Sequence, residues 1–286
     1  MKKIITFALV AILALGTFSM VSCDKTKTSS DTDPKTEQKA PSTEADNDKT
    51  NDETDDVKGP AKRDKLVIYT NAEFAPFEYK VGEKIVGVDI DICQKIADKF
   101  GAELEIVDTK FESIIVAVTE GKADIGASGF TITADRLKEV NFSDVYYEAT
   151  QHIIVPKDSP IESVDDLAGK TVAVQQATTG HIYMDELKLE GTTIVPLANA
   201  NVAALGLGDK YDAIVIDDLT ALNIATVNGF DTIKIEAESP EFYGLAISKE
   251  DTELLEVANQ VIKEMIDNNQ ITDSLKKHIV DSAVTE

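Results

Sequence analysis

Cysteine and histidine are scarce in this chain, and the motifs of common enzyme classes are missing. Its 286 residues include two cysteines and three histidines, and no serine or cysteine pairs with a histidine in a recognisable nucleophile motif. The sequence also lacks a glycine-rich phosphate loop, a zinc-ligand spacing and a repeat of fixed period. We therefore expect neither a metal nor a cofactor, and we do not expect an enzyme.

Basic residues are few relative to acidic ones. The chain has 28 Lys and Arg against 52 Asp and Glu, which gives a formal net charge of -24. This balance argues against nucleic acid and against anionic lipid headgroups as partners. It favours solubility, and it attracts small cationic solutes over a distance that physiological salt limits to about 8 Å.

Residues 1–22 have the pattern of an export signal. "MKKIITFALVAILALGTFSMVSC" begins with a short basic stretch, continues as an apolar run and ends in small residues before Cys23. "SMVSC" resembles the lipobox of bacterial lipoproteins, although Met20 stands where Leu is usual. The resemblance implies cleavage before Cys23 and attachment of lipid, such as palmitate, to it. An uncleaved membrane anchor is the alternative. We expect an exported chain anchored by lipid to the outer face of the cytoplasmic membrane, periplasmic or at the cell surface.

Residues 23–63 contain almost no apolar side chains. Thr, Asp, Lys, Ser and Pro dominate this segment, so it cannot bury enough surface to offset its chain entropy. We predict a disordered, polar and acidic tether that spans on the order of 35 Å as a flexible coil.

From residue 64 onward, short β-branched runs alternate with helical periods. This alternation predicts an α/β fold with mostly parallel strands. The βα units are too many for one small core, so we expect two lobes: residues 64–148 plus 245–286 form lobe 1, and residues 149–244 form lobe 2, with hinge strands at its ends. The expected strands are 66–70, 103–108, 123–128, 171–175, 193–197, 212–217, 231–236 and 241–248, and the expected helices are 89–101, 112–121, 134–140, 178–189, 200–208, 219–226, 251–269 and 271–280.

Two small residues in this part are informative. Gly244, inside the expected strand 241–248, suits a hinge or a close backbone approach, although it could also mark a bulge. Cys93 lies among apolar residues of an expected helix, where a thiol behaves as a small apolar group. With Cys23 lipidated, Cys93 has no partner for an internal disulfide.

Five segments resemble, in their order and spacing, one family of proteins. They are "YTNAEFAPFEY", "VGVDIDICQKIADKFG", "SGFTITADRLKEVNFSDVYYEATQ", "GKTVAVQQATTG" and "YDAIVIDD". Together they resemble the polar amino acid-binding members of family 3 of the bacterial extracellular solute-binding proteins, which feed ABC importers. The resemblance extends from about Lys65 to the C-terminus, and it implies a periplasmic-binding-protein-like fold that holds a free amino acid between two lobes.

The carboxylate of a free amino acid suits a guanidinium, which can make two parallel hydrogen bonds to it. The resemblance assigns this role to Arg136; taken alone, Arg136 could be a solvated residue at the start of a helix. Thr131 would add a hydroxyl and a backbone amide. Ser128 and Gly129 would let the ligand approach the main chain.

A helix start in the second lobe would complete the anion site. The amides of Thr178, Thr179 and Gly180 follow an expected strand and open an expected helix, where free amides favour an anion. Taken alone, the two threonines could simply cap that helix.

For the ligand's ammonium group, the resemblance points to Asp217 as acceptor. It follows an expected parallel strand, whose carboxyl end lies at the crevice where α/β proteins bind ligands. Its alternative role is a helix cap, which neighbouring Asp218 could also fill. The resemblance implies further that the rings of Phe74 and Phe111 sandwich the ligand's side chain, whereas Phe77 is expected in the core.

The residues that would choose among amino acids are Asn71, Glu73, Glu148 and Gln175. "YYEATQ" and "VQQATTG" most resemble binders of arginine, lysine and histidine, in which carboxylates meet the distal positive charge. Asn71 is neutral where several relatives carry Asp, which leaves glutamine or another polar amino acid open. Glu73 could also face solvent.

The expected mechanism is closure of the two lobes on the ligand by hinge bending, in a monomer whose closed form is recognised by a membrane permease. Three alternatives remain: a dehydratase acting on prephenate or arogenate with the same fold, a sensor module, and an adhesive surface lipoprotein. The last of these would not require Arg136.

Overall fold

The computed structural model describes residues 60–236 and 240–283, which belong to a single unit by their contacts. The expected signal peptide, Cys23 and the expected tether up to residue 59 lie outside the described residues. Within the described part of the chain, no helix combines the length and the apolar character that crossing a membrane requires.

Contacts with the folded part begin before residue 64. The terminal nitrogens of Arg63 donate to the two carboxylate oxygens of Asp251 at 2.8 and 2.7 Å, and its guanidinium lies 4.7 Å from the centre of the Phe100 ring. The backbone amide of Ala61 donates to Glu253 at 2.8 Å. The last residues of the expected tether are therefore held against helices of the folded part.

Lobe 1 is built on a five-stranded sheet of order β5-β1-β6-β15-β7. β1 is parallel to β5 and β6, while β15 is antiparallel to β6 and β7. A small antiparallel sheet, β2-β3-β4, adjoins it. The strands are β1 (Lys65–Thr70), β2 (Glu73–Phe74), β3 (Glu78–Val81), β4 (Lys84–Val86), β5 (Glu103–Asp108), β6 (Ile125–Gly126), β7 (Asn141–Phe142) and β15 (Ala246–Ile247), and the helices are α1 (Val88–Phe100), α2 (Phe111–Thr119), α3 (Arg136–Glu139), α7 (Thr252–Asp267) and α8 (Gln270–Ser282).

Lobe 2 is built on a second five-stranded sheet, of order β11-β10-β12-β9-β13. β10 is parallel to β11 and β12, and β9 is antiparallel to β12 and β13. Its strands are β9 (Gln151–Val155), β10 (Thr171–Gln175), β11 (Thr193–Leu197), β12 (Ala213–Asp217) and β13 (Asp231–Lys234), and its helices are the 3-10 turn η1 (Val164–Leu167), α4 (Thr179–Leu187), α5 (Ala200–Ala204) and α6 (Asp218–Asn228). The predicted two-lobe α/β fold with mixed sheets is confirmed, and in each five-stranded sheet two pairs of neighbouring strands are parallel and two are antiparallel.

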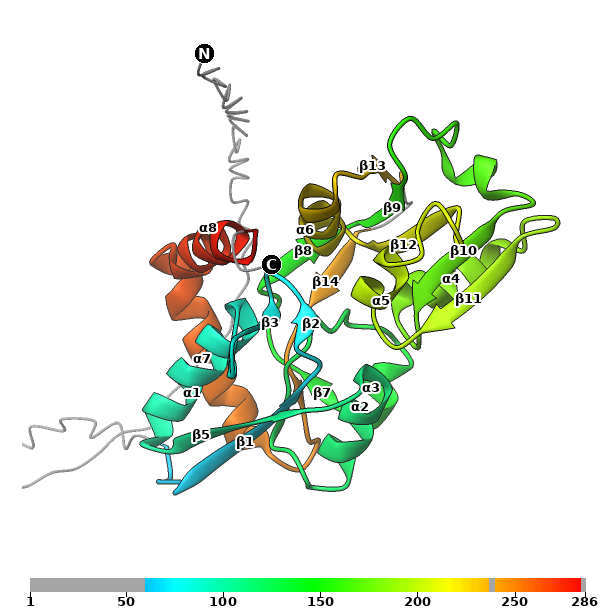
Figure 1. Ribbon diagram of the computed structural model, residues 1–286. Helices are drawn as coiled ribbons and strands as arrows, with labels where there is room; N and C mark the ends of the chain where they lie inside the picture. The colour runs from blue at the N-terminus through cyan, green and yellow to red at the C-terminus, as the bar shows by residue number, and fades with distance from the viewer. Residues whose placement is uncertain (1–59, 237–239, 284–286) are drawn as a thin grey trace, which may run out of the picture. The chain divides into compact units, whose positions relative to one another are not determined.

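The chain passes between the two large sheets through a pair of short strands. β8 (Tyr147–Ala149) and β14 (Glu241–Tyr243) are antiparallel, with Glu241 opposite Ala149, and Figure 1 shows them between the two sheets. The single strand predicted over 241–248 is wrong, because β14 and β15 belong to different sheets. Gly244 lies between them, where a Cβ would lie 3.1 Å from the Ser143 carbonyl oxygen. It therefore permits a close backbone approach.

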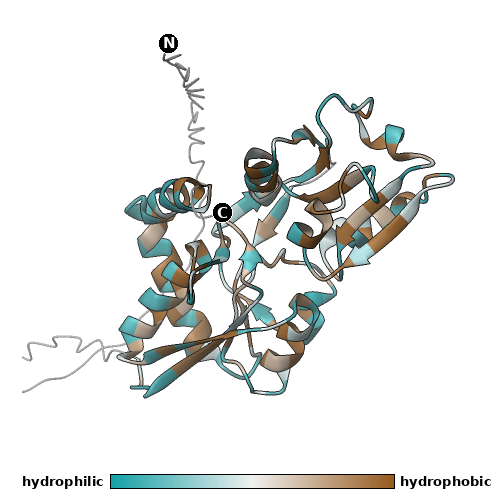
Figure 2. Cartoon of the chain, viewed as in Figure 1, coloured by the Kyte–Doolittle hydropathy of each residue, from teal (hydrophilic) through white to brown (hydrophobic). Residues whose placement is uncertain are grey.

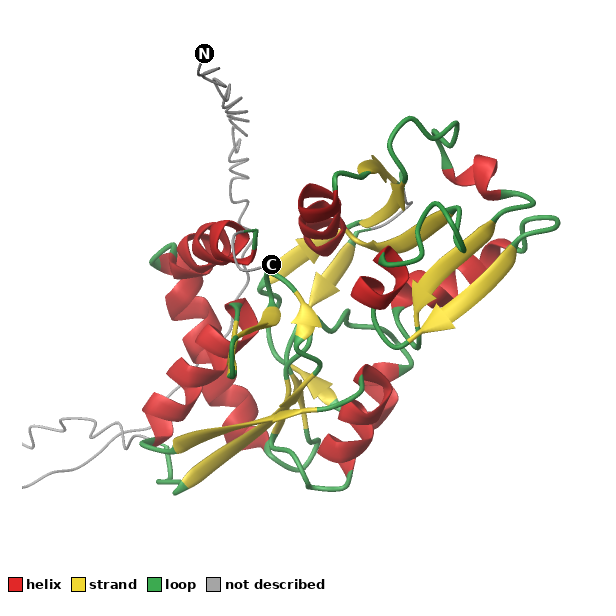
Figure 3. Cartoon of the chain, viewed as in Figure 1, coloured by secondary structure: helices red, strands yellow, loops and turns green. Residues whose placement is uncertain are grey.

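The hydrophobic pattern explains why the helices pack as they do. In α1, apolar side chains recur on one face and are buried, and the helix ends at Gly101, which has a positive φ of 64°. Cys93 on this helix is fully buried, as expected, and burial raises the pKa of its thiol. Figure 2 shows that hydrophobic residues gather along the strands, and Figure 3 shows the same strands with the helices beside them.

Candidate functional site

A small pocket lies where the carboxyl ends of strands from both lobes meet. β10 ends at Gln175, β12 ends at Asp217, and the segment after β6 contributes Ser128 and Gly129 from the other lobe. Strand ends of this kind are where α/β proteins bind ligands. Ten of the sequence-predicted residues line this pocket: Phe74, Phe111, Ser128, Gly129, Thr131, Arg136, Gln175, Thr178, Thr179 and Asp217.

Arg136 is the first residue of α3, and its guanidinium is fixed by backbone oxygens of both lobes. It donates to the Thr131 carbonyl at 2.8 Å and to the Ala177 carbonyl at 3.3 Å, and it lies over the rings of Phe111 and Phe130, 5.4 and 5.1 Å from their centres. Among the residues that the structure describes, no carboxylate oxygen lies within 4.0 Å of its nitrogens. Burial lowers the pKa of Arg136, but a guanidinium stays charged at neutral pH. The result is a rigidly held positive charge that can accept an anion.

The N-terminus of α4 faces the same pocket. Thr178 caps this helix, since its hydroxyl oxygen accepts from the His181 amide at 3.2 Å. Thr179 and Gly180 form the first turn, whose free amides carry the positive end of the helix dipole. Gly180 does not line the pocket but supports it: a Cβ there would lie 2.7 Å from Oε1 of Gln151.

Asp217 ends β12 and is 4% exposed. Its Oδ1 accepts from the Gln151 amide at 2.8 Å, and its Oδ2 accepts from the Tyr243 hydroxyl. Burial, and secondarily the nearby carboxylate of Glu241, raise the pKa of Asp217 to about 7. Although Asp217 occupies the cap position of α6, its side chain makes no capping bond; the Asp218 carboxylate accepts from the Leu219 amide instead, at 2.8 Å. The Asp217 carboxylate therefore remains available to the pocket.

Two buried carboxylates shape the lobe 1 side of the pocket. The Ser128 hydroxyl donates to Glu78 at 2.9 Å, and the Gly129 amide donates to Asp89 at 3.0 Å. Both acids are fully buried; burial raises the pKa of Glu78, and raises that of Asp89 to about 6. Gly129 has a φ of 53°, and a Cβ there would lie 2.8 Å from the Phe74 ring. Sequence reasoning did not single out Glu78 and Asp89, although acidic residues at otherwise apolar positions of "PFEY" and "VGVDID" were a usable signal.

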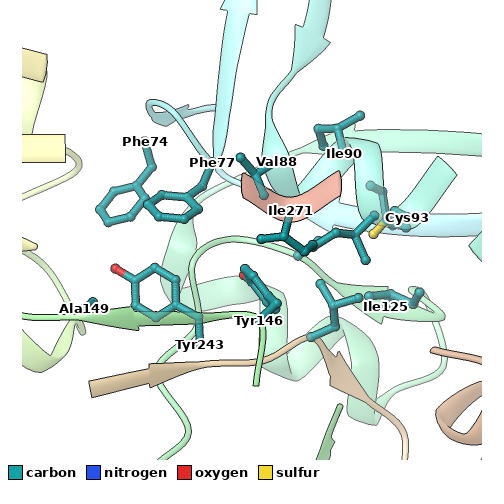
Figure 4. Packing of buried hydrophobic residues seen from close by; sticks show 14 of the residues in the cluster. Phe74, Phe77, Val88, Ile90, Cys93, Ile125, Tyr146, Ala149, Tyr243 and Ile271 are labelled. Atoms are coloured by element: carbon teal, nitrogen blue, oxygen red, sulfur yellow. The ribbon is translucent and has the colours of Figure 1, made fainter. Parts of the chain in front are cut away.

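The aromatic residues divide between pocket and core. Phe77 is fully buried, which confirms its predicted core position, and it packs against Tyr243 with ring centres 5.1 Å apart. Figure 4 shows this cluster of rings, with the Tyr243 hydroxyl on the side of Phe74. Phe111 stacks on Phe130 at 4.6 Å with planes 23° apart. Phe74 and Phe111 both line the pocket, so each presents an apolar surface to whatever enters it.

The residues predicted to choose the ligand are only partly in the pocket. Asn71 is buried beside it, where its side-chain oxygen accepts from the Gln175 amide of the other lobe at 3.1 Å. Glu73 lines a different pocket, and its side chain and carbonyl accept from Asn201 at 3.3 and 3.2 Å. Glu148 is exposed on β8. In this arrangement, Arg136 and Asp217 are the charged residues among those lining the main pocket.

Sequence reasoning did not select Gln151 and Glu241, two further residues that hydrogen-bond to residues lining the pocket. The Gln151 amide donates to both Asp217 and Glu241 at 2.8 Å. Both residues lie near the ends of the predicted lobe 2, where hinge strands are expected. Short strands have too few residues for the hydrophobic pattern to show which side chains point inward. Within 60–236 and 240–283, no group of three or more His, Cys, Asp or Glu is arranged to hold a metal ion.

Known proteins match most of the part of the chain that the structure describes. Residues 66–281 match the bacterial extracellular solute-binding proteins, family 3. The arginine-binding extracellular protein ArtP of Bacillus subtilis is 38% identical over 220 residues, which cover 74% of this chain and 85% of that protein.

Two solved structures share the fold and more than a quarter of the residues. The amino acid ABC transporter substrate-binding protein AbpA of Streptococcus pneumoniae, bound to L-arginine, has a TM-score of 0.73 and 30% identity, and the match covers 77% of this chain and 96% of that one. An ancestral arginine-binding protein bound to glutamine has a TM-score of 0.69 and 35% identity, with 78% and 99% covered. On the strength of the match over residues 66–281, this chain belongs to the bacterial extracellular solute-binding proteins of family 3.

Proposed function

We propose that the protein is the substrate-binding component of an amino acid ABC importer, which captures a free polar amino acid between its lobes. The observation that carries this proposal is the placement of one cation and one acid from different lobes around a single pocket. Arg136 comes from lobe 1 and Asp217 from lobe 2, and both line the pocket. The two charged ends of a zwitterion need such a pair.

Arginine, lysine or histidine is the proposed ligand class. Support comes from the relatives, because ArtP is named as an arginine-binding protein and the AbpA structure contains L-arginine. The rings of Phe74 and Phe111 add a surface suited both to an aliphatic stem and to a delocalised cation.

Glutamine is the second candidate, and one contact favours it. Asn71 and Gln175, which lie where the ligand's side chain is expected to be recognised, are neutral and bonded to each other at 3.1 Å. Neutral amides can both donate to and accept from a ligand amide. The ancestral arginine-binding protein bound to glutamine shows that a related pocket accepts this ligand.

The remaining parts of the proposal concern the cell. We place the protein outside the cytoplasmic membrane, held by lipid on Cys23 and acting as a monomer that passes its ligand to a membrane permease. The family consists of binding proteins, and we propose binding without turnover here. An assay of prephenate or arogenate consumption tests the alternative of a dehydratase with this fold.

A thermal-shift screen against the twenty amino acids tests the function. A ligand at a thousandfold excess over its Kd adds about 4 kcal/mol to the free energy of unfolding. Arg136→Ala should abolish that gain, since it removes the guanidinium that lines the pocket. Lys138→Ala is the matched control, because it removes an exposed cation from the same helix. Absence of stabilisation by every amino acid, or equal stabilisation of Arg136→Ala, would refute the proposal.

A further inference from the structure

The carboxylate of Glu241 is held by donors from both lobes. Its Oε2 accepts from the hydroxyls of Thr131 and Thr179, each at 2.6 Å, and its Oε1 accepts from the Gln151 amide at 2.8 Å. Thr131 belongs to lobe 1, whereas Gln151 and Thr179 belong to lobe 2. Glu241 itself lies on β14, one of the two strands that connect the lobes. A single carboxylate therefore bridges the lobes at their connection.

Two of these donors belong to the anion site described above. Thr131 and Thr179 line the pocket beside Arg136, and Thr179 stands in the first turn of α4. Arg136 and Glu241 also attract each other electrostatically, although they are not in direct contact. Hydroxyls, a helix start and a guanidinium are the groups that bind a carboxylate. In this structure the hydroxyls of Thr131 and Thr179 already donate to a carboxylate of the chain itself, that of Glu241.

A second carboxylate cannot share these hydroxyls with Glu241. Each hydroxyl has one proton to donate, and two like charges within a few ångströms repel. Glu241 is partly exposed at the first position of β14, so its side chain can turn toward solvent without unfolding the strand. Its departure would also relieve the repulsion between Glu241 and Asp217.

We infer that Glu241 is an internal competitor for the anion site: its carboxylate holds Thr131 and Thr179, and closes the lobes on itself, until the carboxylate of an amino acid displaces it. This inference rests on the proposed function. It adds that the affinity for the amino acid depends on how readily the ligand's carboxylate replaces that of Glu241. It also adds that this replacement removes the negative charge of Glu241 from the vicinity of Asp217.

Calorimetric titration with arginine, using the wild-type protein, Glu241→Ala and Glu241→Gln, tests the inference. Glu241→Ala should bind arginine with a Kd roughly tenfold lower than that of the wild type. This is the expected gain if Glu241 occupies the anion site in about nine-tenths of the ligand-free wild-type molecules, because only the remaining tenth can bind directly. Glu241→Gln, which keeps the shape but loses the charge, should also bind more tightly than wild type. Glu236→Gln is the matched control: it removes the same charge from an exposed position five residues earlier and should leave the Kd unchanged.

Competition between acetate and arginine gives a second measurement, which would not change if Glu241 had only a structural role. In Glu241→Ala the two hydroxyls are free for a small carboxylate, so acetate should compete with arginine at lower concentrations than it does in the wild type. Weaker or unchanged arginine binding by both variants, with an intact thermal unfolding transition, overturns the inference. Failure of the wild type and of both variants to bind any amino acid overturns the proposed function, and this inference with it. Binding by the wild type without improvement in the variants overturns this inference alone.

Discussion

Binding of arginine should release a proton from Asp217. Burial and the charge of Glu241 raise the pKa of this carboxyl to about 7 before binding. A ligand ammonium in hydrogen-bond contact favours the ionised form and lowers the pKa by about two units. Arginine itself keeps its ammonium and guanidinium protonated at pH 6, where the release should be largest. The proton that leaves therefore belongs to the protein.

The size of the effect follows from these two values. With a pKa near 7 in the free protein and about 5 in the complex, about 0.8 proton leaves per arginine at pH 6, and about 0.1 at pH 8. The sign is that acid weakens binding, because at low pH the ligand must displace a proton. Between pH 8 and pH 6 the Kd should rise about tenfold, which corresponds to about 1.4 kcal/mol.

Calorimetry in two buffers of different ionisation enthalpy measures the released protons directly. Asp217→Asn should weaken binding and abolish the release. Asp218→Asn is the matched control, because that neighbouring carboxylate is bonded to Leu219 and Tyr147 outside the pocket. Binding enthalpies that do not depend on the buffer at pH 6, or a release that persists in Asp217→Asn, would refute the reasoning.

Three further substitutions test the supporting structure. Gly180→Ala places a Cβ 2.7 Å from the side chain of Gln151 and should weaken arginine binding by up to about tenfold, measured by calorimetry; unchanged affinity would show that this side chain can move freely. Asp251→Ala removes both the ion pair with Arg63 and the cap of α7, and should cost about 1–3 kcal/mol in urea unfolding; a loss below 0.5 kcal/mol, on the order of a neutral surface change, would contradict this. Asp89 has its pKa raised to about 6, so the wild type should lose about 2 kcal/mol relative to Asp89→Asn as the pH rises from 4 to 7, and a pH-independent difference would contradict the buried charge.

The fold was largely predictable from periodicity. The strand expected at 66–70 corresponds to β1 (Lys65–Thr70), and the helix expected at 89–101 corresponds to α1 (Val88–Phe100), because each buries a regular apolar face. Elements at the lobe connection were harder. β14 has three residues and β15 has two, too few for a pattern of period two, and their assignment to different sheets depends on contacts distant in sequence.

The site was predictable where the resemblance supplied the positions. Arg136, Thr131 and Asp217 lie around one pocket, as expected, although their roles in ligand binding stay predictions. The residues expected to recognise the ligand's side chain were less predictable. Glu73 lies in a separate pocket and bonds to Asn201, because the direction of its side chain depends on the other lobe. Glu241 could not be found from sequence, since its importance comes from hydroxyls more than sixty residues away along the chain.

The central claim is that Arg136 and Asp217 hold the two charged ends of one amino acid. A crystal structure of the protein grown with arginine tests it most directly. The account predicts the ligand's carboxylate within hydrogen-bond distance of both terminal nitrogens of Arg136, and its ammonium within hydrogen-bond distance of the Asp217 carboxylate. An arginine molecule in the pocket that contacts neither residue would contradict it.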